Sequence, residues 1–122
     1  MRVVHKWIEN NILIEIQDNL NFQALLEANA FIISSPKFDY MSYQIFDFLK
    51  VKNIEITHQD VKTFSMLQKN AMRWNDSIKV ALIAVNPQII NDFEIYIADM
   101  QEVGSKCKLF ENIDDALEWC LE

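Results

Sequence analysis

Asp47 is the carboxylate whose sequence context best suits chemistry. It lies inside the mostly apolar and aromatic residues 43–49, where a buried acid is costly unless it is hydrogen-bonded. One interpretation is an acid–base or ligand-polarising group. The other, which we favour, is an acid at the carboxyl end of a strand that caps the loop after it.

The two histidines and two cysteines do not form a recognisable catalytic or metal-binding set. His5 falls in a predicted edge strand and His58 at a predicted helix start, so a shared metal site would need further ligands nearby. Cys107 and Cys120 form no Cys-x-x-Cys motif, and their predicted positions in a strand and on the inner face of a helix favour inert core thiols. We therefore predict no catalytic residue, no metal and no cofactor.

Glycine content and net charge exclude several classes of ligand. Gly104 is the only glycine, whereas P-loops and dinucleotide-binding loops need several glycines so that the backbone can approach phosphate. A nucleotide could bind only loosely, at a capped helix start. The net charge of −7, from 18 acids and 11 bases, argues against nucleic acids and anionic membranes as partners.

Length and hydropathy predict one domain, residues 1–122, in a reducing compartment. The length lies near the common domain size. No apolar run approaches the roughly 18 residues of a membrane span, and the first residues lack the apolar core of a signal peptide. Free thiols without an export signal favour a cytoplasmic protein.

Hydrophobic periodicity predicts an α/β fold in the order ββαβαβαβα. The predicted strands are residues 3–8, 12–16, 43–49, 78–85 and 107–110, and the predicted helices are about 21–34, 57–75, 86–103 and 112–121. Alternating strands and helices imply a mostly parallel five-stranded sheet with an antiparallel N-terminal edge strand and four helices. The tryptophans Trp7, Trp74 and Trp119 are assigned to core packing rather than to an aromatic binding box.

With this element order, the chain resembles the STAS-like fold, named for sulfate transporters and anti-sigma-factor antagonists, and in particular small, mostly uncharacterised bacterial proteins of that type. The similar segments are residues 35–38 (SPKF), 45–47 (IFD), 79–83 (KVALI) and 110–119 (FENIDDALEW). The last segment is the most specific, although it is a structural signature of strand, cap and helix.

The resemblance also indicates where a regulatory serine would lie. In the anti-sigma antagonists of this fold it stands in an Asp-Ser-x-Gly-like motif at the start of the helix after the central strand. Here Glu55 matches the acid, Ile56 takes the serine position, Thr57 falls one place later, and the glycine is absent. This departure argues against a phosphorylation switch, and we favour Thr57 as a helix cap over a modified residue.

The leading functional hypothesis is a non-enzymatic cytoplasmic regulatory module that binds a protein of unknown identity. Its predicted contact residues are Thr57, His58 and Asp60, because ligands gather at the carboxyl ends of the strands in open α/β sheets. The exposed first hairpin could also pair two copies as a homodimer.

Two other classes of function stay open. A small-molecule carrier or sensor, for a lipid or a nucleotide, would use a pocket between sheet and helices. Its candidate lining residues are Phe38, Tyr40 and Tyr43, which with Pro36 would form an aromatic rim, and Asp47. The third hypothesis is an enzyme that pairs Asp47 with His58.

Overall fold

A mixed six-stranded β-sheet forms the centre of the computed structural model, which describes residues 2–122. The main path has the order β1-β2-β3-β5-β6, and β4 pairs with β2 beside it. β1 and β2 are antiparallel, and all other pairs are parallel. The strands are β1 (Arg2–Ile8), β2 (Asn11–Asn21), β3 (Tyr43–Asp47), β4 (Val51–Glu55), β5 (Lys79–Ile83) and β6 (Lys106–Phe110).

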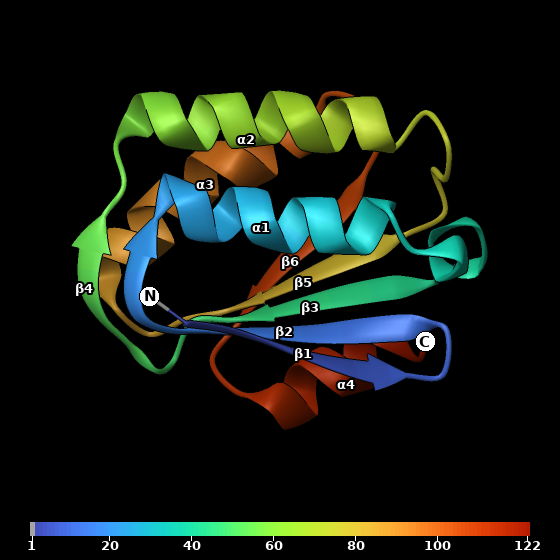
Figure 1. Cartoon of the computed structure of the whole chain (residues 1–122), viewed down its shortest axis with the longest axis horizontal. Helices are drawn as coiled ribbons and strands as arrows, with labels where there is room; N and C mark the ends of the chain where they lie inside the picture. Colours follow the sequence, from blue (N-terminus) through green and yellow to red (C-terminus); the bar gives the residue numbers. More distant parts are fainter. Residues whose placement is uncertain (1) are drawn as a thin grey trace.

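The helices cover both faces of this sheet. α1 (Phe22–Ile33), α2 (His58–Ala71) and α3 (Pro87–Gln101) lie on one face, and α4 (Ile113–Cys120) lies on the other (Figure 1). A short 3-10 helix, η1 (Pro36–Tyr40), connects α1 to β3. The structure confirms the predicted α/β class, the antiparallel N-terminal edge and the four helices. No helix within residues 2–122 has the length and apolar character to cross a membrane.

The predicted strand count of five is wrong, because residues 51–55 form β4 instead of a loop. β2 continues past Ile16 to Asn21 and pairs first with β3 and then with β4. The register shifts after Asp18, whose φ of 64° bends the strand at a bulge. β4 escaped prediction because it is short, half-exposed and polar at Lys52 and Asn53, without the apolar alternation of a buried strand.

Each face of the sheet has its own core. Ile12, Ile14 and Ile16 of β2 are fully buried beneath the three-helix layer, as their alternation predicts. On the α4 face, Ile45 and Ile83 pack with Ala116 and other side chains of a smaller cluster. An ion pair also joins two helices of the three-helix layer, since Nζ of Lys62 in α2 lies 3.0 Å from Oδ1 of Asp99 in α3.

Asparagine side chains cap the starts of three helices. Asn21, Asn86 and Asn112 each accept a hydrogen bond from a backbone N–H in the first turn of the helix that follows. Gly104 ends the α3 segment with a φ of 76°, the left-handed conformation that favours glycine. These caps fix the starts of the helices that position the candidate site.

Trp74 departs from the predicted core. α2 ends at Ala71 rather than near residue 75, so Trp74 lies in the turn after the helix and is 81% exposed. The helical spacing that suggested burial does not apply beyond the last helical turn.

Candidate functional site

The starts of α2 and α3 form the candidate site, at the carboxyl ends of the parallel strands. Thr57 and Asp60 make a complete capping box at the start of α2. The Thr57 hydroxyl accepts from the Asp60 N–H at 3.1 Å, and the Asp60 carboxylate accepts from the Thr57 N–H at 3.0 Å. The box confirms the predicted cap and holds the backbone of Thr57 in one conformation.

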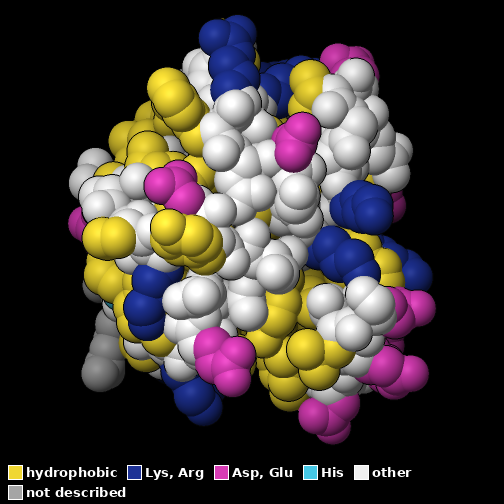
Figure 2. All heavy atoms as spheres, turned by 90° about the vertical axis from the view of Figure 1, so that its right-hand side faces the viewer, with side chains coloured by type: hydrophobic (Ala, Val, Ile, Leu, Met, Phe, Trp, Pro, Cys, Tyr) yellow, Lys and Arg dark blue, Asp and Glu magenta, His cyan; other side chains and the backbone are white. Residues whose placement is uncertain are grey.

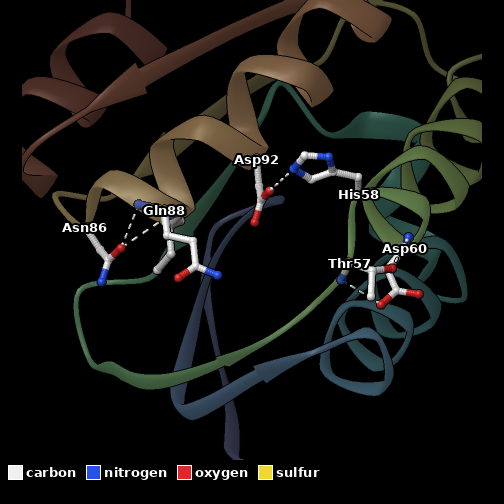
Figure 3. Close-up of polar contacts among 7 residues, drawn as sticks. Thr57, His58, Asp60, Asn86, Gln88 and Asp92 are labelled. Atoms are coloured by element: carbon white, nitrogen blue, oxygen red, sulfur yellow. Dashed lines mark hydrogen bonds and ion pairs between the residues drawn. The ribbon is translucent and has the colours of Figure 1, made fainter.

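His58 leaves this turn toward α3. Its Nε2 lies 3.5 Å from Oδ1 of Asp92, in the second turn of α3 (Figure 3). The His58 side chain is 76% exposed and that of Asp92 only 7%, so the pair joins a surface imidazole to a buried carboxylate. Thr57 and Asp60 point away from this pair, on the other side of the start of α2 (Figure 3).

Asp92 is a site residue that the sequence analysis missed. Its spacing from Ile89 and from the neighbouring Phe93 places it beside the buried stripe of α3. A carboxylate beside the apolar stripe of a helix, like Asp47 within its apolar strand, is the sequence signal that could have identified Asp92.

The Asp92 carboxylate is held in an unfavourable environment. Burial raises its pKa, and the nearby His58 opposes that shift. Its Oδ2 atom is buried and has no hydrogen-bond partner within residues 2–122. Since buried polar atoms are nearly always satisfied and perturbed carboxylates concentrate at functional sites, Asp92 marks this end of the molecule as a candidate site.

Replacing Asp92 by asparagine is expected to raise the free energy of unfolding at neutral pH by on the order of 1 kcal/mol. The folded state raises the pKa of Asp92, so wild-type stability is lost as the pH rises through that value. The variant escapes this cost, and it gives up only a weak pairing with exposed His58. Urea unfolding at several pH values measures the difference, which should shrink as the pH falls toward about 4 and be absent below it.

The matched control is Asp76→Asn, at an exposed turn, which should show no such pH-dependent gain. A D92N protein that is less stable than wild type at neutral pH would contradict the assignment, because it would mean that the ionised carboxylate is stabilised in place.

Asp47 performs the capping role that the sequence favours. Its Oδ1 accepts a hydrogen bond from the Leu49 N–H at 2.9 Å, directly after β3. Burial raises the pKa of Asp47, and this hydrogen bond opposes the shift. No hydrogen bond or ion pair joins Asp47 to His58 in the described part of the chain, so the geometry does not bring the two together as an acid–base pair.

The four residues of the predicted aromatic rim are not assembled into one rim. Phe38 packs in the core of the three-helix face and Tyr43 in the core of the α4 face, on opposite sides of the sheet. Pro36 and Tyr40 are exposed. The apolar void between the sheet and the three helices measures about 10 Å³, about one water molecule. This void is smaller than a small-molecule site as it stands, and the carrier function stays a prediction.

The two cysteines and His5, the other candidate nucleophiles and metal ligands, are packed against neighbouring side chains. Burial raises the pKa of Cys107 to about 12 and that of Cys120 to about 11, which suits inert thiols. His5 stacks on Phe31 with ring centroids 3.7 Å apart, and burial lowers its pKa. Within residues 2–122, no three His, Cys, Asp or Glu side chains lie close enough together to hold a metal ion.

Solved structures share this fold along nearly the whole chain. The anti-sigma-factor antagonist SpoIIAA in its unphosphorylated form matches with a TM-score of 0.62 and 11% identity, over 98% of this chain and 97% of that one. An anti-sigma-factor antagonist from Mycobacterium paratuberculosis matches with a TM-score of 0.62 and 11% identity, over 99% and 94%.

An uncharacterised protein from Shewanella loihica with a SpoIIAA-like fold matches with a TM-score of 0.56 and 12% identity, over 98% of this chain and 92% of that one. The sequence matches no protein-family model, and no curated protein shows significant similarity to it. The predicted STAS-like fold is thus confirmed, and at these identities the likeness concerns the fold alone.

Proposed function

We propose that this protein is a non-enzymatic regulatory module that binds another protein through the start of α2. The observation that carries the proposal is the likeness in fold to two anti-sigma-factor antagonists over nearly the full length of each chain. Proteins with this role act by contact with a partner and need no catalytic set. The cytoplasm is the compartment we propose, given the buried free thiols.

The start of α2 suits docking because it is exposed and rigid at once. Thr57 and His58 are exposed, and the capping box fixes their backbone. Asn86 and Gln88, at the start of α3, are also exposed and extend the polar surface past the His58–Asp92 pair (Figure 3). A pre-organised surface loses less conformational entropy on binding than a mobile one.

Control by phosphorylation at the motif position is not part of this proposal. Ile56, which aligns with the regulatory serine, is half-buried and packs against the core of the three-helix face. The only hydroxyl beside it, that of Thr57, already accepts the capping hydrogen bond from Asp60.

The test is affinity purification from native lysate with quantitative mass spectrometry, comparing wild type with Thr57→Glu and His58→Ala. We expect a specific partner whose recovery falls at least about tenfold with Thr57→Glu, because a hot-spot change costs about 1.4 kcal/mol or more. The glutamate adds a negative charge next to Asp60 and removes the hydroxyl of the cap.

Two control variants separate binding from folding. Thr57→Ser keeps the capping hydroxyl and should keep the partner, and Lys106→Ala changes an exposed side chain on β6, away from α2. Thermal unfolding of each variant verifies that all are folded. Equal recovery with wild type, Thr57→Glu and His58→Ala would refute this surface as the docking site.

A further inference from the structure

A groove lies at the opposite end of the molecule from the start of α2. Its volume is about 430 Å³, which is within the range of small-molecule sites. Three elements and a turn form its walls: α1 (Asn29, Ile33), η1 (Phe38, Asp39), α2 (Leu67, Asn70, Ala71) and the turn after it (Trp74). Figure 2 faces this end and shows hydrophobic side chains at the surface beside scattered acidic ones.

The apolar lining of the groove is unusually exposed. Trp74 is 81% and Ile33 46% exposed, whereas Phe38 forms a buried wall. Both exposed side chains leave apolar surface in water. Exposed apolar surface that gathers in a concave site is typical of a place where a ligand binds.

The walls are held in place before any ligand arrives. The Asn75 side-chain amide donates to the carbonyls of Phe38 and Met41, both at 2.9 Å, and its Oδ1 accepts from the Ser77 N–H at 3.1 Å. This single side chain fastens η1 to the turn that carries Trp74. The groove is therefore pre-organised, which lowers the entropy cost of binding.

A buried chain of hydrogen bonds orients one donor at the groove. The Tyr96 hydroxyl donates to Oε1 of Gln68 at 3.2 Å, and Nε2 of Gln68 donates to Oδ1 of Asn29 at 2.7 Å. Asn29 is only 6% exposed and lines the groove. With its oxygen committed to Gln68, its Nδ2 makes no hydrogen bond to the described residues, and it is not one of their buried unpaired atoms. It is therefore available to a ligand in the groove.

The other polar groups of the groove restrict the charge of that ligand. The Asp39 carboxylate is an acceptor, and the Asn70 amide can donate or accept. A negative ligand would be repelled by Asp39 and by the net charge of −7. The groove therefore suits a ligand with an aromatic ring, one hydrogen-bond acceptor that faces Asn29 and one donor that faces Asp39.

We propose that this groove binds an aromatic carboxamide without a negative charge, or a heterocycle with the same neighbouring acceptor and donor. The ring packs against Trp74 and Phe38, the ligand carbonyl accepts from Asn29 Nδ2, and the ligand N–H donates to Asp39. This inference does not depend on the proposed protein partner, because it concerns the other end of the molecule.

The test is a titration of ¹⁵N-labelled protein with 1-naphthamide, followed by NMR. We expect saturable shifts of the Trp74 indole N–H and of the Asn29 side-chain amide. Trp74→Ala should weaken binding by about 2- to 12-fold, the worth of one aromatic pair. Met66→Ala, an exposed apolar residue of α2 outside the groove, is the matched control and should bind like wild type.

Two further probes test the polar contacts. 1-Naphthoate, which replaces the amide by a carboxylate, should bind more weakly than 1-naphthamide, and 1-acetylnaphthalene, which lacks the donor, should fall about 2- to 12-fold below it. Equal binding of the three compounds, no shift at Asn29, or a Trp74-dependent dimer that occupies the groove would each overturn the proposal.

Discussion

Replacing Phe46 by alanine is expected to lower the free energy of unfolding by about 3–5 kcal/mol. Phe46 lies in the middle of β3 and is 1% exposed. Its ring contacts Phe48 and packs edge-on against Phe64 of α2, with centroids 6.5 Å apart in both pairs. The substitution leaves a cavity that a sheet bonded on both sides cannot close. Urea unfolding, followed by circular dichroism, measures the loss.

The comparison variant is Leu121→Ala, an exposed apolar residue after α4, which should stay within about 0.5 kcal/mol of wild type. Phe46→Leu should recover much of the loss, since it refills most of the cavity. Because total stability of a domain is about 5–15 kcal/mol, the alanine variant should approach the limit of folding. A loss below about 1 kcal/mol would contradict this account of the core.

The effect matters for the candidate site as well. Phe64 of α2 packs against Phe46 of β3, and it also stacks on Tyr96 of α3 with centroids 5.6 Å apart. The aromatic contacts thus fix the distance between the two helices whose starts carry His58 and Asp92. A variant that loosens this layer is expected to weaken partner binding without touching the docking surface.

The parts of this fold that the sequence predicts are those governed by local rules. The alternation of Ile12, Ile14 and Ile16 predicts a strand face, and the structure buries all three. Asn86 before Pro87 predicts the start of α3, and Thr57 with Asp60 predicts a capping box. In each case neighbouring residues determine the outcome, so no knowledge of the tertiary structure is required.

The parts that escape prediction depend on distant residues. β4 is a strand only because the long β2 bends at Asp18 and offers it a second edge. The His58–Asp92 pair joins two helices, and neither residue shows its partner in the sequence. Tyr43 and Phe38 look like one aromatic rim along the chain, but β3 directs Tyr43 to the opposite face of the sheet.

Replacing Gln68 by leucine is expected to lower the free energy of unfolding by about 2–4 kcal/mol, because each buried group left without its partner costs about 1–3 kcal/mol. Gln68 is 2% exposed and joins Tyr96 to Asn29. Leucine keeps most of the volume but leaves the Tyr96 hydroxyl and the Asn29 oxygen without a hydrogen-bond partner. Urea unfolding measures this loss, and a change below about 0.5 kcal/mol would contradict the network.

A triple variant separates what the Asn29–Gln68–Tyr96 hydrogen bonds contribute to stability from what they contribute to ligand binding. Asn29→Leu, Gln68→Leu and Tyr96→Phe together replace every member of the network by an apolar group of similar shape, a change that can be nearly neutral. We expect this protein to recover most of the stability that Gln68→Leu loses. If it does, the network is not needed for stability, and its role at the groove rests on the Asn29 amide, which this variant lacks. The same variant should then bind 1-naphthamide about 2- to 12-fold more weakly than wild type, whereas unchanged affinity would show that the aligned donor has no part in recognition.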